Sequence, residues 1–205
     1  KSTLANLIIR LYDAGQGSVL VNGVDVARYP LEQLRQKIGF VQQGAELFTG
    51  TIADNIRWGC QDAPLDRVQK AAETAQAAEF IDRMPHGYQT LLGKGGKGLS
   101  GGQRQRVAIA RALVREPQIL ILDDAASALD FATDAKLRTA LKNRQGDTAV
   151  ITISQRASAI RHCDQILVLK EGEAAGLGSH EELMQSCEEY REIVLSQLEE
   201  GEEPQ

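Results

Sequence analysis

The sequence contains few of the residues that build metal centres or disulfide frameworks. Its cysteines are odd in number and follow no metal-ligand spacing, which favours reduced thiols in a cytosolic protein. The histidines are equally scattered, so we expect surface or helix-end residues rather than ligands. The cysteines are Cys60, Cys163 and Cys187, and the histidines are His86, His162 and His180.

Long apolar segments are also missing from these 205 residues. No apolar run approaches the roughly 18–20 residues that a membrane span needs, and no signal peptide opens the chain. A composition of 42% hydrophobic and 25% charged residues suits a soluble globular domain with a sizeable core. The net charge of -5 gives no argument for a nucleic-acid partner. The acidic end is interpreted as a solvated tail: Glu199, Glu200, Glu202 and Glu203.

The chain begins with Lys1 rather than methionine, in the tripeptide KST, so we expect a fragment cut at its start. One helical face follows directly, marked by Leu4, Leu7, Ile8 and Leu11. Such tripeptides are common, but one that precedes a helix fits the end of a phosphate-binding loop, GxxxxGKS/T. In that loop, backbone amides cradle phosphates, the lysine reaches the terminal phosphates and the hydroxyl binds magnesium.

Strand-like and helix-like segments alternate, which predicts an α/β fold with a largely parallel sheet. Strands are expected within 18–26, 38–42, 119–122, 149–153 and 165–169. The first of these carries an Asn-Gly turn signal. Residues from about 51 to 116 have helical periodicity and no good strand, which predicts a helical insertion in the sheet. Two more helices are expected near 180–186 and 188–199.

The segment LSGGQRQRVAIARAL (99–113) indicates an anion-binding helix terminus. Ser100 is a good N-cap, and Gly101 and Gly102 leave their backbone amides unobstructed at the start of the helix. An ordinary capped helix would explain Ser100 but not the two glycines, because glycine costs stability inside a helix. The functional interpretation is therefore favoured. Further along, ILILDD (119–124) is the pattern of a strand that delivers carboxylates to a metal–phosphate site.

The chain resembles the ATPase domain of an ABC transporter in four motifs, in this order: LSGGQ (99–103), ILILDD (119–124), SALD (127–130) and ISQR (153–156). The resemblance covers essentially the whole chain, and further segments are similar to ABC exporters rather than importers. It implies a P-loop NTPase fold of the ABC type, with a mostly parallel core sheet and an inserted helical subdomain. The implied segments are a core part starting within the Walker A loop (1–50), the helical subdomain with the signature motif (51–116), a second core part with the Walker B, D-loop and switch motifs (117–178), and C-terminal helices with an acidic tail (179–205).

The resemblance also implies the cofactors, ATP and magnesium, and the residues that hold them. In this family the signature of one chain faces the γ-phosphate held by the partner subunit. The residues expected to contact ATP are Lys1, Ser2 and Thr3 from Walker A, Ser100, Gly101, Gly102 and Gln103 from the signature, and Asp130 from the D-loop. The expected metal ligands are Ser2, Gln43 and Asp123, and the expected catalytic positions are Asp124, Gln155 and Gln43.

Two departures from the family pattern concern catalysis. Asp124 stands where the family has a catalytic glutamate, and Gln155 stands where it has a switch histidine. We expect both changes to impair hydrolysis while they spare nucleotide binding. The loop ahead of the signature reads GKGG (93–96) where exporters usually carry GERG, so the coupling contacts of that loop are not carried over.

The predicted function is therefore the ATP-binding domain of an ABC exporter, at the cytoplasmic face of the inner membrane. The predicted partners are a second, different ABC ATPase domain in a head-to-tail dimer and a transmembrane domain upstream in the parent chain, with no nucleic acid. Its intact signature would complete a hydrolytic site on the partner, while its own site would be slow. The alternatives are an ordinary homodimeric exporter ATPase and a purely allosteric nucleotide-binding module.

Overall fold

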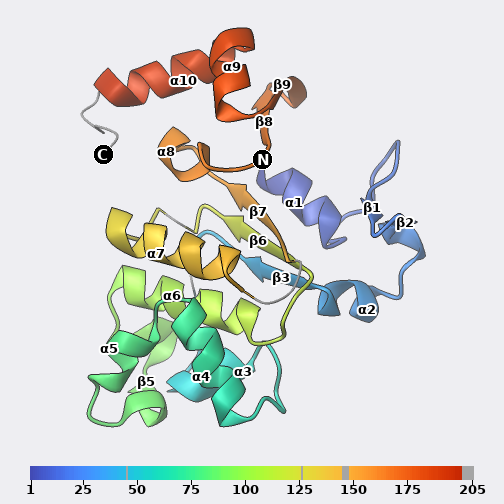
Figure 1. Ribbon diagram of the computed structural model, residues 1–205. Helices are drawn as coiled ribbons and strands as arrows, with labels where there is room; N and C mark the ends of the chain where they lie inside the picture. Colours follow the sequence, from blue (N-terminus) through green and yellow to red (C-terminus); the bar gives the residue numbers. More distant parts are fainter. Residues whose placement is uncertain (45, 126, 145–147, 200–205) are drawn as a thin grey trace. The chain divides into compact units, whose positions relative to one another are not determined.

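The structure is a computed structural model that describes all residues except 45, 126, 145–147 and 200–205. Backbone contacts divide the chain into two compact units (Figure 1). One unit comprises residues Ser2–Ile151, and the other comprises Lys1 together with Thr152–Gln205. Most of the predicted acidic tail, Glu200 onwards, lies outside the described residues. The predicted division into four functional segments remains a prediction.

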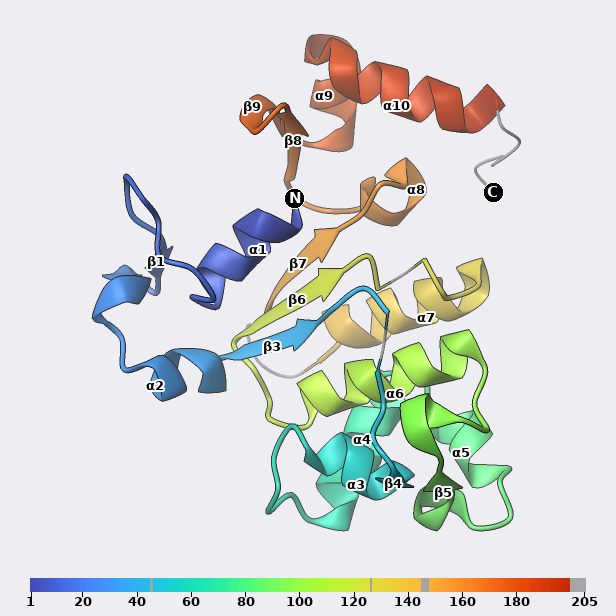
Figure 2. The same cartoon turned by 180° about the vertical axis from the view of Figure 1, so that it is seen from behind.

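A three-stranded sheet has the order β3 (Ile38–Val41), β6 (Ile119–Asp123), β7 (Ala149–Ile153), and β3 and β6 lie wholly in the first unit. Strands β3 and β6 are parallel, with Ile38 opposite Ile119 and Val41 opposite Leu122, and Figure 2 shows them running side by side in the same direction. Their side chains are mostly buried, because both faces of a parallel sheet are covered. The predicted α/β fold with parallel strands is confirmed.

Helices of the expected insertion pack on one another beside this sheet. Helix α6 (Gly101–Leu113) contacts β3, α3 (Ile52–Arg57) and α4 (Leu65–Thr74), and a short α5 (Ala78–Asp82) follows α4. The insertion is not free of strands, however. Strands β4 (Gly50–Thr51) and β5 (Leu91–Leu92) form an antiparallel pair, so the prediction of no strand in this region is wrong. Two residues are too few to show a period-2 pattern in the sequence.

The amino-terminal part of this unit contains α1 (Ser2–Ile8), the hairpin β1 (Leu20–Val21) and β2 (Val24–Asp25), a short 3-10 turn η1 (Val26–Arg28) and α2 (Leu31–Gln36). Asn22 and Gly23 both have positive φ, 51° and 75°, as the predicted turn requires. Helix α1 ends before Leu11 because Arg10 adopts a left-handed conformation, φ 52°. Ala5 in α1 and Ile9 just after it are buried, whereas Leu4 and Leu11 of the predicted face are exposed.

Three further elements complete the first unit: the 3-10 turns η2 (Gly87–Gln89) and η3 (Lys94–Gly96), and helix α7 (Phe131–Lys142). The second unit contains α8 (Ala157–Ile160), the antiparallel hairpin β8 (Ile166–Lys170) and β9 (Glu173–Gly178), and helices α9 (His180–Ser186) and α10 (Glu188–Glu199). Helices α9 and α10 confirm the two helices predicted near 180–186 and 188–199. The core of the second unit consists of Ile166, Val168, Leu183, Cys187 and Tyr190.

Cys60, Cys163 and Cys187 carry reduced thiols. Within the described part of the chain, no helix has the length and apolar character that crossing a membrane requires. No group of three or more histidine, cysteine, aspartate or glutamate side chains among the same residues is arranged to hold a metal ion.

Candidate functional site

The carboxyl ends of β3 and β6 form one site. Because the strands are parallel and Val41 pairs with Leu122, the residues that follow each strand meet at the same edge of the sheet. The Gln43 amide nitrogen Nε2 donates a hydrogen bond of 3.1 Å to Oδ2 of Asp124. The structure therefore brings together two of the predicted catalytic residues, which lie 81 positions apart in the sequence.

Asp123, the last residue of β6, is only 7% exposed. Within the described residues no backbone or side-chain group donates a hydrogen bond to its carboxylate. A buried carboxylate is costly unless a cation or donor compensates its charge. Helix α1, which begins at Ser2, contacts β6. The Asp123 carboxylate thus fits a magnesium ligand, since magnesium takes one or two carboxylates and keeps several waters.

Asp124 has an unusual backbone conformation for a residue with a side chain, φ 49°. Aspartate and asparagine adopt the left-handed region at lower cost than most other residues. Ser127 stabilises the turn that follows, since its backbone N–H and its hydroxyl both donate to the Asp124 carbonyl oxygen, at 3.2 and 2.7 Å. The turn and the hydrogen bond from Gln43 together fix the direction of the Asp124 carboxylate.

The predicted anion-binding terminus is the beginning of α6. Ser100 is its N-cap and forms a capping box with Gln103: the Gln103 N–H donates to Ser100 Oγ at 3.2 Å, and the Ser100 N–H donates to Gln103 Oε1 at 2.9 Å. A Cβ on Gly101 would meet nothing closer than 4.0 Å, whereas one on Gly102 would lie 2.9 Å from the Ala128 carbonyl oxygen. Gly102 therefore permits close packing against the D-loop, and Gly101 faces open space.

Asp130 has a structural role that the sequence prediction did not include. It is the N-cap of α7, and its carboxylate accepts hydrogen bonds from the Thr133 N–H at 2.9 Å and the Thr133 hydroxyl at 2.8 Å. These hydrogen bonds hold the pKa of Asp130 below its ordinary value. A contact between Asp130 and nucleotide stays a prediction.

The remaining predicted residues divide between the two units. Ser2 and Thr3 are exposed in the first turn of α1. Lys1 belongs to the second unit, where its Nζ donates to the Ser154 carbonyl oxygen at 3.2 Å. Gln155 belongs to the second unit as well, and its side chain is exposed.

Asn55 is a positioning residue that the sequence reasoning missed. It is 1% exposed and exchanges two hydrogen bonds with the backbone of Phe48, at 2.8 and 2.9 Å. It also donates to the Thr51 carbonyl oxygen at 3.0 Å and accepts from Arg111 Nη2 at 3.1 Å. Phe48 stacks on Trp58 with ring centroids 4.4 Å apart, and the two rings remain 43% and 60% exposed. The sequence signal was a polar residue on the same helical face as Ile52 and Ile56.

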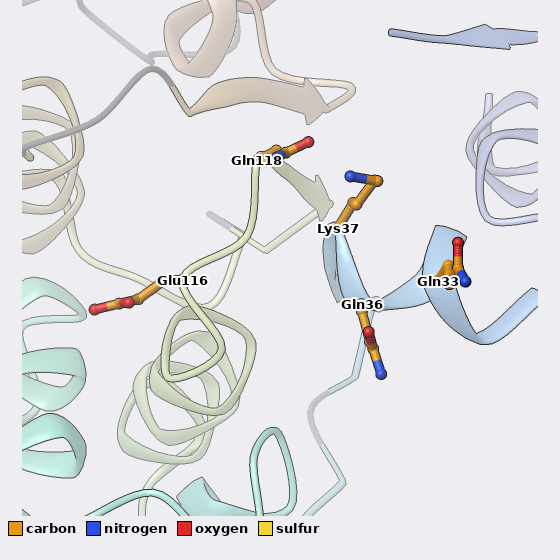
Figure 3. Close-up of a pocket in the computed structure, with 5 residues that line it drawn as sticks. All are labelled: Gln33, Gln36, Lys37, Glu116 and Gln118. Atoms are coloured by element: carbon orange, nitrogen blue, oxygen red, sulfur yellow. The ribbon is translucent and has the colours of Figure 1, made fainter. Parts of the chain in front are cut away.

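A polar pocket of about 260 Å³ lies at the opposite edge of the sheet (Figure 3). Lys37 and Gln118, which line it, immediately precede β3 and β6 and therefore mark the amino ends of these strands. The other lining residues are Gln33, Gln36 and Glu116. None of the predicted site residues lines this pocket, so it is separate from the site at the carboxyl ends.

The parallel strands β3 and β6, followed by Gln43 and Asp124, and the glycine-bearing start of α6 belong to a P-loop nucleotide-binding fold of the ABC type. The chain belongs to the ABC transporter family, whose model, described as "ABC transporter", matches residues 1–127.

Several relatives are similar over nearly the whole chain. An uncharacterized ABC transporter ATP-binding protein of Bacillus subtilis, YfiB, is 46% identical over 198 residues, which cover 97% of this chain and 34% of YfiB. The ATP-dependent lipid A-core flippase of Vibrio vulnificus is 44% identical over 202 residues, which cover 98% of this chain and 35% of the flippase. A solved structure of a bacterial Atm1-family ABC exporter with ATP bound matches with a TM-score of 0.92 at 41% identity, over 97% of this chain and 35% of that chain. The chain spans about a third of the length of these relatives.

Proposed function

We propose that this chain is the nucleotide-binding domain of an ABC exporter, which binds ATP with magnesium and takes part in ATP hydrolysis that powers export. The observation that carries the proposal lies at the carboxyl ends of β3 and β6. There Gln43 forms a hydrogen bond with Asp124, next to the buried Asp123. Resemblance to exporters along nearly the whole chain supports the assignment.

The residues present fit magnesium and ATP. Asp123 would bind the metal, with the Ser2 hydroxyl and the Gln43 side-chain oxygen as further ligands. Bound magnesium would neutralise charge on the β- and γ-phosphates. Lys1 and Thr3 would contact the phosphates directly. This set, with one carboxylate, one hydroxyl and one amide oxygen, suits magnesium, which is usually bound by one or two protein carboxylates together with waters and substrate phosphates.

The chain's own site is proposed to be slow in hydrolysis. Aspartate is shorter than glutamate by one carbon–carbon bond, about 1.5 Å. A misplacement of about 1 Å can lower a catalytic rate about a hundredfold. Asp124 is moreover engaged by Gln43 and fixed in a left-handed turn, which limits its reach toward a water molecule. Gln155 can exchange hydrogen bonds with a phosphate but cannot carry a proton at neutral pH.

The intact signature is proposed to serve a partner's site. Its helix has free backbone amides and a positive dipole end, both of which favour a phosphate. Gly101 leaves the approach open. A second ABC ATPase domain in a head-to-tail dimer would bring its ATP to this terminus. The partner is proposed to be a different subunit, because only then does one dimer combine a slow site with a working one. An ordinary homodimer and a purely allosteric module are the alternatives.

The membrane domain of the parent chain is the second proposed partner, which would place this domain at the cytoplasmic face of the membrane. The stacked pair Phe48 and Trp58 offers an exposed aromatic surface for it, held in place by Asn55. Aromatic side chains are enriched where proteins dock on one another. The neighbouring loop supplies the exposed Lys94, at the position where exporters usually have a glutamate, and the exposed Lys97.

The decisive experiment compares two substitutions in the full-length protein with its partner. Asp124→Asn should change steady-state ATP hydrolysis only modestly, because this carboxylate belongs to the slow site. Gly101→Asp should nearly abolish hydrolysis, since it places a negative charge against the partner's γ-phosphate. At about 4 Å and an effective dielectric of about 20, two like charges repel by about 4 kcal/mol, or roughly a thousandfold in rate.

Gly101→Ala is the matched control, because the space around this glycine accepts a methyl group and the variant adds no charge. We expect it to retain most of the activity. Equal damage from Asp124→Asn and Gly101→Asp would mean that every site depends on both residues. The chain would then be an ordinary homodimeric ATPase, and the slow-site assignment would be refuted.

A further inference from the structure

The side chain of Gln197, in the last turns of α10, forms hydrogen bonds with the backbone of Gln155, a predicted catalytic position, and of Ala157, two residues later. Its Nε2 donates to the Gln155 carbonyl oxygen at 2.7 Å, and its Oε1 accepts from the Ala157 N–H at 2.8 Å. The residues so joined are 42 and 40 positions apart and belong to the same compact unit. Both hydrogen-bonding groups of the Gln197 amide are therefore used on one short loop.

The hydrogen bond between Gln197 and the Ala157 N–H takes the place of a side-chain cap at the start of α8. Arg156 is the N-cap of α8, and no side-chain cap hydrogen bond is made there. The first N–H groups of a helix need partners from outside the helix, and Gln197 satisfies the one of Ala157 from α10. Within the loop, Ser154 Oγ accepts from the Arg156 N–H at 2.9 Å. The backbone around Gln155 is thus held at several points, while the Gln155 side chain stays exposed.

Helix α10 is itself well anchored, so it can serve as a reference for the loop. Tyr190 on α10 is 2% exposed, and its hydroxyl lies 2.9 Å from Nδ1 of His180. Cys187 and Leu183 are buried in the same cluster. The first half of α10 is therefore fixed by a packed core, and Gln197 follows two turns later on the same helix.

We propose that Gln197 is a positioning residue for Gln155, and that the C-terminal helix α10 thereby controls the loop that meets the γ-phosphate. The inference rests on the proposed function, in which the Gln155 side chain faces bound ATP. Gln197 contacts only the backbone of Gln155. It thereby fixes the position of the Gln155 backbone and leaves the side-chain amide of Gln155 available to the phosphate. A shift of α10 would accordingly be transmitted to Gln155.

The test uses the full-length protein with two substitutions of Gln197 and one control. Gln197→Leu removes both hydrogen bonds at similar size. Gln197→Glu keeps an acceptor for the Ala157 N–H but loses the donor to Gln155. Ser196→Ala is the control, because Ser196 is exposed on the same helix and its hydroxyl donates to the Ile193 carbonyl oxygen within that helix.

Two quantities are measured for each variant. Amide hydrogen exchange of the Ala157 N–H directly reports its hydrogen bond to Gln197. Gln197→Leu should accelerate this exchange about tenfold, as expected for one lost hydrogen bond. The slow phase of single-turnover ATP hydrolysis reports this chain's own site. Both Gln197 variants should lower that rate about tenfold without changing ATP affinity, since a mispositioned group acts on chemistry and not on binding. Ser196→Ala should change neither quantity.

Gln197→Glu separates positioning from simple capping. A residue that only caps α8 would be replaced by glutamate without loss of rate, whereas a positioning residue would not. Combining Gln197→Leu with Gln155→Ala should add no further loss, because Gln197 acts through Gln155. Unchanged exchange at Ala157, a full-rate Gln197→Glu variant or additive losses would each overturn the inference. If Gln155→Ala alone leaves the rate unchanged while Gln197→Leu accelerates exchange, the fault lies in the assigned role of Gln155 within the proposed function.

Discussion

Replacing Asn55 with alanine should destabilise the unit of residues 2–151 and release the exposed aromatic pair. Asn55 is 1% exposed, and its amide makes four hydrogen bonds, two of them with the backbone of Phe48. Thr51 remains the N-cap of α3 through its side chain, and Arg111 keeps its bonds to the Asn55 and Glu46 carbonyl oxygens. The main loss therefore falls on the N–H and carbonyl groups of Phe48.

Each buried polar group left without a partner costs about 1–3 kcal/mol, and Phe48 is partly open to water, so the lower half of that range applies. Two such groups and the weakened Arg111 contact give a loss of about 3 kcal/mol. For a unit of this size, that loss corresponds to a fall in Tm of roughly 6–12 °C. The same change frees the Phe48 ring from its stack with Trp58.

Trp58 is the single tryptophan of the sequence, so tryptophan fluorescence reports this region without labelling. We expect the emission of the native Asn55→Ala variant to differ from that of the parent chain, and its thermal transition to come earlier. Asn143→Ala is the control, because Asn143 is exposed. A fall in Tm no larger than that of the control, with unchanged Trp58 emission, would refute the role of Asn55 in holding Phe48.

Two further predictions concern the same unit. Gly59→Ala should prevent normal folding or lower Tm far more than Asn55→Ala, because the added Cβ would lie 1.9 Å from the Arg111 carbonyl oxygen. Thermal unfolding measures the fall in Tm, and a Tm within about 2 °C of the parent would contradict the packing argument. The hydrogen bonds from Thr133 lower the pKa of Asp130, so this carboxylate contributes stability that is present above its unfolded pKa, about 4, and is lost as the pH falls through its folded pKa. Asp130→Asn should therefore lower stability at neutral pH, change it little at acid pH and so flatten the acid dependence. Urea unfolding midpoints at neutral and acid pH measure this, and an unchanged slope would contradict it.

Local patterns predicted the parts of the fold that depend on neighbouring residues. The runs that became β3 and β6 are apolar on both faces, and a strand buried between helices requires that composition wherever it occurs. The start of α6 at Ser100 followed from N-cap chemistry within four residues. The pair β4 and β5 and the strand β9, with its run EAAGLG, gave no such signal. These strands form because a distant partner pairs with them, and not because their own residues favour extended structure.

The sequence by itself determined the membership of the chain in a nucleotide-binding family, the order of its motifs and the two departures at Asp124 and Gln155. Only the tertiary structure decided which atoms meet: Gln43 with Asp124, Asn55 with Arg111, and Gln197 with the Gln155 backbone, at separations of 81, 56 and 42 positions. The physical reason is that propensity, capping and periodicity act within a few residues, whereas a side-chain hydrogen bond depends on packing that places both partners within about 3 Å.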